Sequence, residues 1–369
     1  MKIAYIAETS LTNKSAYTQH VVKMCDAFSQ INHDVSLFLP EVKKELKFKS
    51  IKKKFILNSK NKIKIISILN MKSSNFILRL IFGLKVVLKL KKKNFDIILT
   101  RSFIASLFLS LFKIYHFLEI HSEFRSFTKF YMINLNFINS KYIIKKILIS
   151  KALNKIFKIK KNKVLILHDG SDLKNFKKFK KIKKIKTATY VGSFYKGRGI
   201  ELLVSLAKKF KNIKFKLYGQ TNINYTSDIK NLKFFNHIEY CKVPDILAKS
   251  DLLLMPYEEK VYIRAKNINT ADYCSPLKMF DYLASGKIIL SSKLNGICEV
   301  LKHNNNAIIV KNSKLESWIK VFNNIMSESY NINRLQKKSY ETAKKYSWNK
   351  RASVIIDSKI NHNQVKEYK

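Results

Sequence analysis

Two apolar runs open the chain, Ile3-Ala-Tyr-Ile-Ala7 and Val35-Ser-Leu-Phe-Leu39, and residues 16–30 lie between them. Each run is continuous rather than alternating, which is typical of strands buried on both faces of a parallel sheet. In the intervening stretch the apolar residues recur along one face of a helix. Strand, helix and strand in this order form the repeating unit of a doubly wound parallel sheet. The opening of the chain therefore predicts an α/β fold.

The same pattern recurs along the chain. Further strands are predicted at residues 95–100, 115–120 and 164–167, and then at 189–191, 215–218, 233–235, 252–255, 288–290 and 307–310. Helices are predicted at residues 200–210, 244–249, 276–284 and 314–327, and a helical tail at 339–360. The lysine-rich residues 174–186 are interpreted as a basic linker. We therefore predict two Rossmann-like domains facing a cleft, residues 1–180 and 181–345, followed by a tail of residues 346–369.

Charge is the most extreme feature of the composition. The formal net charge is +47, from 72 Lys and Arg against 25 Asp and Glu. Such a field attracts anions, including nucleic acid, acidic lipid surfaces and phosphorylated substrates. A gene rich in A and T would also produce a lysine-rich protein without any such selection. Residues 75–93 form a basic amphipathic stretch, which fits either an anionic membrane surface or an internal helix with a solvated lysine face.

The sequence carries no mark of secretion or of a membrane span. The four cysteines are far apart, which indicates a reducing compartment with neither disulfides nor a zinc site. No signal peptide precedes the first strand. The most apolar stretch, residues 102–112, is shorter than the ~20 residues that a spanning helix needs. We expect a cytoplasmic protein whose membrane contact, if present, is peripheral.

The first candidate site is Gly192-Ser-Phe-Tyr-Lys196-Gly197-Arg198-Gly199, which follows a predicted strand and opens a helix. Glycines allow a close backbone approach, and the amides of a helix start attract a phosphate. Lys196 and Arg198 would add positive charge. A tight strand–helix turn with surface cations explains the same residues equally well.

The second candidate site is the helix start Ser275-Pro276-Leu277-Lys278, with Asp281 one turn further on. Ser275 suits the N-cap and Pro276 the first helical position, so the amides of Leu277 and Lys278 would face a phosphate. Asp281 could accept hydrogen bonds from ribose hydroxyls. An ordinary capped amphipathic helix is the alternative, but it leaves the charged residues in the apolar face unexplained.

A third candidate is His121, which ends an apolar strand and has Glu119 nearby. A histidine in this position is more often structural than catalytic. Its place at the carboxyl end of a predicted strand favours a role in the site.

Several motifs in the second half recur together in a known family. The motifs are, in order, Tyr190-Val-Gly-Ser-Phe-Tyr-Lys-Gly-Arg-Gly199, Leu217-Tyr-Gly219, Leu254-Met-Pro-Tyr257 and Ser275-Pro-Leu-Lys-Met-Phe-Asp-Tyr-Leu-Ala-Ser-Gly-Lys287. With this order and spacing, residues 187–348 resemble the donor domain of glycosyltransferase family 4, which has the two-domain GT-B fold. The first half is similar to the family more weakly, through residues 15–33, Leu118-Glu-Ile-His121 and His168-Asp-Gly-Ser-Asp172. The tail resembles the family's terminal helix, which crosses back onto the N-terminal domain.

The resemblance implies a role for each matching residue. Lys196 and Arg198 would neutralise the donor diphosphate, and the amides of Leu277 and Lys278 would hold its phosphates. Asp281 stands where the family has the second Glu of its paired-Glu motif, which binds the ribose. His121 stands at the family's active-site histidine.

Two positions depart from the family pattern. The first Glu of the pair falls at Tyr273, with Asp272 beside it, and a tyrosine cannot replace a carboxylate on the donor sugar. Ser193 stands where the family usually has Arg or Lys. Because of these two departures, an inactive transferase is a further alternative.

The resemblance implies a retaining, metal-independent glycosyltransferase of the hexosyltransferase type, which moves a sugar from a nucleoside diphosphate to a hydroxyl acceptor with no further cofactor. The acceptor implied is a surface polysaccharide or a lipid-linked glycan. One alternative is a sugar-nucleotide epimerase of the same architecture. The other is a non-catalytic basic protein that binds RNA or a membrane, although no RNA-binding motif is present and no nucleic-acid partner is expected.

Overall fold

The computed structural model describes residues 1–43, 46–61, 63–70, 75–177, 179–219, 228–262 and 269–367, with side chains to residue 360. The chain forms two compact units. The N-terminal unit contains Met1–Ile149, Leu153–His168 and Trp348–Lys369, and the C-terminal unit contains Ser150–Ala152 and Asp169–Ser347. Apart from the short segment Ser150–Ala152, the chain passes from the N-terminal to the C-terminal unit between residues 168 and 169. The sequence analysis predicted this domain boundary between residues 180 and 181.

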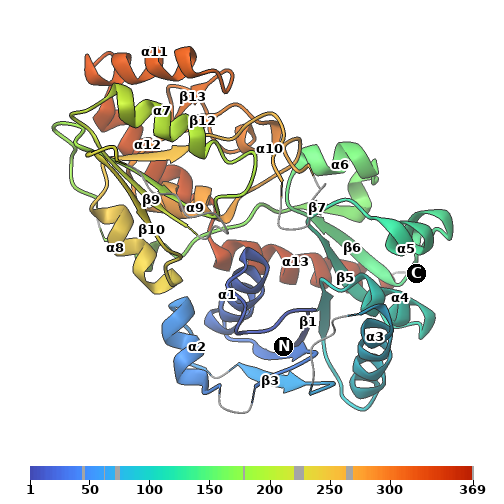
Figure 1. Ribbon diagram of the computed structural model, residues 1–369. Helices are drawn as coiled ribbons and strands as arrows, with labels where there is room; N and C mark the ends of the chain where they lie inside the picture. The colour runs from blue at the N-terminus through green and yellow to red at the C-terminus, as the bar shows by residue number, and fades with distance from the viewer. Residues whose placement is uncertain are drawn as a thin grey trace. The chain divides into compact units, whose positions relative to one another are not determined.

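The N-terminal unit is built on a seven-stranded parallel sheet of order β3-β2-β1-β4-β5-β6-β7 (Figure 1). Its strands are β1 (Lys2–Ile6), β2 (Asp34–Leu39), β3 (Lys64–Ser67), β4 (Ile97–Thr100), β5 (His116–Ile120), β6 (Ile143–Leu148) and β7 (Val164–Ile166). Its longer helices are α1 (Ala16–Gln30), α2 (Phe48–Phe55), α3 (Phe76–Lys91), α4 (Phe103–Leu111) and α13 (Trp348–Glu367). Strands β3 and β6 were not predicted from the sequence because lysines interrupt their apolar runs. In β6, burial of Lys146 lowers its pKa to about 8.

The C-terminal unit holds a six-stranded parallel sheet of order β10-β9-β8-β11-β12-β13. Its strands are β8 (Thr187–Val191), β9 (Lys214–Tyr218), β10 (Leu232–Phe235), β11 (Leu252–Met255), β12 (Ile288–Ser292) and β13 (Ile308–Val310). Its helices include α7 (Ile200–Lys209), α8 (Val243–Ala248), α9 (Leu277–Ala284), α10 (Asn295–Cys298), α11 (Leu315–Met326) and α12 (Ile332–Lys345). The predicted fold class, two doubly wound parallel sheets, is confirmed.

The contacts of helix α1 explain why its sequence pattern predicts a helix. Its N-cap Ser15 accepts a hydrogen bond from the Thr18 amide at 3.2 Å, which satisfies one free donor of the first turn. Nearly all of the helix from Thr18 onward is buried, because the sheet lies on one side and α13 of the same unit packs on another. Figure 1 shows α13, in red, running beside α1.

The basic segment before β8 is not a free linker. The Gln336 side chain on α12 accepts a hydrogen bond from the Ile182 amide at 3.1 Å and donates to the carbonyls of Lys180 and Gly286. Phe179 packs directly over Gly286. The described residues between 174 and 186 therefore belong to the C-terminal unit, and the interpretation as an interdomain linker was wrong because apolar residues between the lysines pack into the core of that unit.

The predicted continuous tail helix is two helices. Helix α12 ends at Lys345 and α13 begins at Trp348, and between them the Tyr346 carbonyl accepts a hydrogen bond from the Ser171 amide at 3.1 Å. Across the described ranges, no helix combines the length and the apolarity that crossing a bilayer requires. The predicted apolar stretch at residues 102–112 is the short helix α4 with its flanking residues.

Candidate functional site

The loop from Gly192 to Gly199 joins β8 to α7, at the carboxyl end of the C-terminal sheet. Gly197 and Gly199 have φ values of +84° and +67°. A Cβ on Gly197 would lie 1.9 Å from the Lys260 carbonyl oxygen, and one on Gly199 would lie 1.8 Å from the Pro256 carbonyl oxygen. These two glycines are therefore required by close packing against the chain after β11.

Gly192 occupies a different environment. A Cβ there would lie 3.1 Å from the Lys278 ammonium nitrogen, Nζ. That ammonium group lies 3.7 Å from the centre of the Tyr190 ring and 5.1 Å from that of Tyr257. The absence of a side chain at Gly192 thus leaves room for the cation, so this glycine belongs with the candidate phosphate site.

Nothing among the described residues balances a positive charge on Lys278. Its Nζ is buried and has no hydrogen-bond partner within the described part of the chain. Burial and the nearby charge of Arg198 together lower the pKa of Lys278 well below its usual value. A buried ammonium of this kind is costly unless an anion joins it.

Arg198 is the second cation of the site. Its guanidinium lies 5.1 Å from the Tyr257 ring centre and donates to the Tyr262 carbonyl at 3.3 Å. Its Nε is buried and unpaired among the described residues. The groups that act most strongly on Arg198 are Tyr257, Tyr190 and Cys274, and those that act most strongly on Lys278 are Arg198 and Cys274. Two adjacent cations in an aromatic shell form a site suited to a phosphate or diphosphate.

The start of α9 differs from expectation in its capping. Pro276 is the N-cap and no side chain caps the helix, so the prediction of Ser275 as N-cap and Pro276 as first helical residue was wrong by one position. Leu277 and Lys278 are the first two helical residues, whose amides have no acceptor within the helix. Ser275 itself is buried.

Asp281 is less available than the sequence suggested. It is 5% exposed, and its Oδ1 accepts a hydrogen bond from the Tyr240 hydroxyl at 3.0 Å. The neighbouring Tyr282 hydroxyl accepts from the Val191 amide at 2.9 Å, which ties α9 to the end of β8. A ribose would have to share or displace the Tyr240 contact.

The two residues at the first position of the paired-Glu motif differ in burial. Asp272 is exposed. Tyr273 is 1% exposed, and its carbonyl accepts a hydrogen bond from the Ser150 hydroxyl at 3.0 Å. Its backbone also packs against Gly296, where a Cβ would meet it. Tyr273 thus acts as a core residue of the C-terminal unit.

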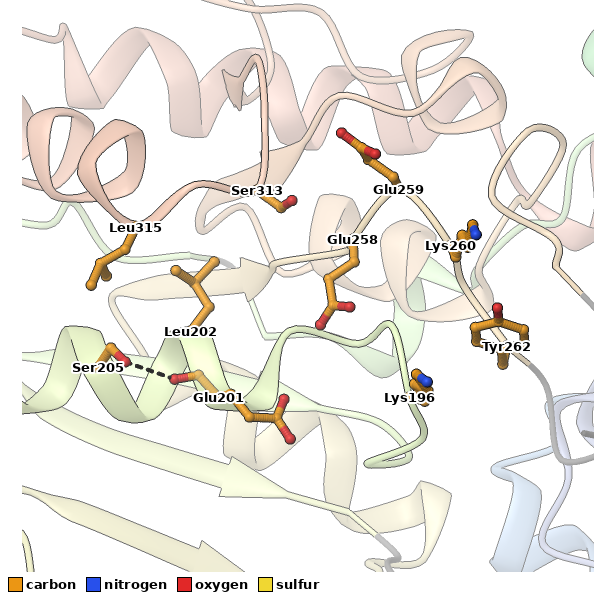
Figure 2. A pocket seen from close by; sticks show the side chains of 10 residues that line it. All are labelled: Lys196, Glu201, Leu202, Ser205, Glu258, Glu259, Lys260, Tyr262, Ser313 and Leu315. Atoms are coloured by element: carbon orange, nitrogen blue, oxygen red, sulfur yellow. Dashed lines mark hydrogen bonds between the residues drawn. The ribbon is translucent and has the colours of Figure 1, made fainter.

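Lys196 lies apart from the two buried cations in its contacts. It is exposed and lines a hollow of about 630 Å³ together with Glu201, Glu258 and Glu259 (Figure 2). Burial and the charge of Glu201 raise the pKa of Glu258. Three carboxyl groups share this hollow with Lys196 and Lys260. Lys196 therefore has different neighbours from Arg198 and Lys278, although its Nζ lies 6.0 Å from the centre of the Tyr262 ring, whose carbonyl accepts from Arg198.

In the N-terminal unit, Glu119 is the centre of a buried polar cluster. Its carboxylate accepts from the Tyr5 hydroxyl at 2.5 Å and from the Arg351 guanidinium, and lies 2.8 Å from His20 Nε2 and 3.1 Å from His121 Nε2. Although burial alone would raise it, the charges of His20 and Arg351 hold the pKa of Glu119 well below its usual value.

The cluster also contains a set of groups that could bind a metal ion. Among the residues described, His20, Glu119 and His121 place potential ligand atoms within 4.8 Å of one another. Arg351, however, donates to the same Oε1 of Glu119 that faces both histidines. The guanidinium thus already supplies positive charge to this carboxylate.

His121 directly follows β5, and its surroundings favour the neutral imidazole. Its side chain is 17% exposed, and burial and the positive charge of Arg101 lower its pKa to about 3, while Glu119 acts in the opposite direction. Sequence reasoning selected His121 and Glu119 but missed His20, Tyr5 and Arg351. The available signal was Arg351 itself, a charged residue among the apolar positions of the tail helix.

The comparisons with known proteins agree with this geometry. A family model described as "Glycosyl transferases group 1" matches residues 185–328. These residues are a group 1 glycosyl transferase domain. The match covers the loop that contains Arg198 and the helix start that contains Lys278. A search of curated proteins finds no significant match for the chain.

Solved structures share the fold of the whole chain at low sequence identity. A glycosyltransferase from Rickettsia africae matches with a TM-score of 0.74, 13% identity and 98% coverage of each chain. Sucrose-phosphate synthase from Thermosynechococcus elongatus matches with a TM-score of 0.75, 13% identity and full coverage of both. HepE from Anabaena in complex with UDP matches with a TM-score of 0.72 and 12% identity, covering 97% of this chain and 99% of that one. These likenesses show the GT-B fold.

Proposed function

We propose that this glycosyltransferase moves a sugar from a nucleoside diphosphate donor to a hydroxyl acceptor, with retained configuration and without a metal ion. The observation that supports the proposal most directly is the pair Lys278 and Arg198, two uncompensated cations at the carboxyl end of the C-terminal sheet. The donor diphosphate would complete their charge balance. Among the structural neighbours, HepE is described in complex with UDP-glucose, which is consistent with this class of donor.

The chemistry follows from where negative charge develops. As the bond to the sugar breaks, charge accumulates on the leaving diphosphate, and cations placed there beforehand stabilise it. The amides of Leu277 and Lys278 at the start of α9 would add hydrogen bonds to the same group. In this proposal Asp281 binds the ribose and His121 lies near the reacting sugar.

The donor can be identified by thermal-shift measurements with a panel of nucleoside diphosphates and their sugars. We expect one nucleoside diphosphate to raise the melting temperature more than the corresponding monophosphate, because the second phosphate engages both cations. Inorganic phosphate and a short RNA serve as controls for unspecific charge binding. If RNA stabilises the protein while no nucleotide does, the basic binding protein is the better reading.

The proposed acceptor is a surface polysaccharide or a lipid-linked glycan, at the inner face of a membrane. One neighbour is a lipopolysaccharide outer core galactosyltransferase, which supports this class. The main structural support is α3, whose buried face contains Val86 and Leu90 while its outer face is also apolar, with Ile77, Leu84 and Leu88 exposed by 66%, 37% and 45%. A lysine-covered solvent face does not explain these outer residues.

A second apolar segment extends the same surface. Phe127 of α5 (Ser126–Lys129) packs edge-on against Phe76 of α3 with ring centres 4.7 Å apart. Phe130 and Leu135, which follow in the chain, are also exposed. Exposed lysines on both segments, such as Lys85 and Lys129, complement anionic lipid. We propose that this surface rests on an anionic membrane.

Vesicle sedimentation tests the membrane surface. The wild type is expected to bind vesicles that contain phosphatidylglycerol, and to bind pure phosphatidylcholine weakly. Replacing Leu84 and Leu88 together by glutamine should reduce binding at least about tenfold, because two side chains no longer enter the interface. Val354→Gln, an exposed apolar residue on α13 of the same unit, is the matched control. Equal binding by the double variant and the wild type would refute the proposal.

A further inference from the structure

Arg101 is a partly buried arginine that directly follows β4, at the carboxyl end of the N-terminal sheet. Its backbone is fixed there, because its amide donates to the Ile6 carbonyl at the end of β1 at 3.0 Å. One face of its guanidinium lies over the Tyr17 ring of α1, with 4.1 Å between Cζ and the ring centre. The position of this cation is thus set by elements of the N-terminal unit alone.

The edge of the guanidinium is less well satisfied than its face. Among the described residues, Nη1 of Arg101 is buried and has no hydrogen-bond partner. A buried donor without an acceptor is rare in a folded protein, because its lost contact with water is not replaced. Since the N–H groups of a guanidinium point outward in its own plane, the stacked ring does not block an acceptor from reaching them.

The neighbouring carboxylates already have other cationic partners. Two carboxylates, those of Glu8 and Glu119, lie close enough to act on the tyrosine beneath Arg101. Glu8 accepts from the guanidinium of Arg79 on α3, and Glu119 from that of Arg351 on α13. These described residues supply three guanidinium groups for two carboxylates. Arg101 is the one without a carboxylate of its own, and an anionic ligand would complete its charge balance.

We propose that Arg101 binds an oxyanion of the acceptor, a phosphate or a sugar carboxylate, at the carboxyl end of the N-terminal sheet. The guanidinium offers paired N–H groups, which both kinds of oxyanion accept with two parallel hydrogen bonds. The assignment of the anion to the acceptor rests on the proposed function, in which the C-terminal unit binds the donor. A phosphate would belong to a lipid-linked glycan, and a carboxylate to an acidic polysaccharide.

The site can be tested by NMR on the full chain labelled with 15N-arginine, which gives only seven Nε signals to resolve. The Arg101 signal is assigned by its loss in Arg101→Lys, or by elimination through the other arginines. The probes are methyl phosphate and glucuronate, titrated at about 0.15 M salt to screen the general attraction of a basic protein for anions. We expect the Arg101 signal to shift and to saturate with at least one probe, with a Kd on the order of 1–10 mM. Tighter binding of methyl phosphate indicates a phosphorylated acceptor, and tighter binding of glucuronate an acidic one.

Arg125, an exposed arginine of the same unit, provides the matched control, and its signal should not saturate with either probe. The proposal is overturned if the Arg101 signal behaves like that of Arg125. It is also overturned if Arg101 responds to a nucleoside diphosphate and to neither probe, because the cation would then belong to the donor. The Arg198 signal reports separately on the C-terminal phosphate site, so a failure of the proposed donor site is distinguished from a failure at Arg101.

Discussion

Replacing Lys278 by methionine is expected to weaken the binding of nucleoside diphosphates by roughly 2 kcal/mol, or about 30-fold, because a hydrogen bond to a charged group is lost. The same change should stabilise the nucleotide-free protein. The wild-type ammonium is buried without a partner and lies beside Arg198, so removing it relieves both desolvation and repulsion. Isothermal titration with the nucleotide identified in the panel measures the first effect, and urea unfolding measures the second.

Opposite signs for binding and stability distinguish a ligand site from a structural lysine. Lys320→Met, at an exposed position on α11 of the same unit, is the matched control and should change neither quantity. Lys196→Met should have a smaller effect than Lys278→Met, because Lys196 lines the acidic hollow. A Lys278→Met protein that is less stable and binds nucleotide as tightly as the wild type would contradict the assignment of this site.

Gly199→Ala is expected to destabilise the protein by roughly 3 kcal/mol or more, the range seen for strained backbone positions combined with a steric clash. The residue has φ +67°, and its new Cβ would lie 1.8 Å from the Pro256 carbonyl oxygen. Backbone on both sides of this contact is anchored, by α7 on one side and by β11 on the other, so neither can give way. The midpoint of urea unfolding checks the effect.

Gly192→Ala, in the same loop, is the informative comparison. Its Cβ would meet the ends of the Tyr190 and Lys278 side chains at 3.1 Å, and side-chain ends can move where backbone cannot. We expect a smaller loss of stability and a larger loss of nucleotide binding than in Gly199→Ala. Equal unfolding midpoints for Gly199→Ala and the wild type would show that the loop does not pack as described.

The architecture was largely predictable from local pattern. Continuous apolar runs such as those of β1 and β2 identify strands buried on both faces, and the one-sided apolar pattern of α1 identifies the helix between them. The order of the motifs in residues 187–348 then indicated the family that the matched domain confirms. Strand β6 was missed because Lys145 and Lys146 break its apolar run, although Lys146 is buried.

The partners of the site residues depended on tertiary structure. Sequence showed that Arg198 and Lys278 are cations near helix starts, but only the adjacency of β8 and β11 in the sheet brings both against Tyr257. Sequence predicted that Asp281 could accept hydrogen bonds from a ribose, whereas in the fold its carboxylate already accepts one from the Tyr240 hydroxyl.

The sequence by itself thus determined the two parallel sheets, the helix between the first strands and the segments that carry the site. Only the tertiary structure decided that Arg351 reaches Glu119 from the far end of the chain, and that Gly197 and Gly199 serve packing. The physical reason is that apolar periodicity is a local property, which can be recognised within one short stretch of sequence. A buried charge, by contrast, takes its partner from whichever element the sheet order places beside it.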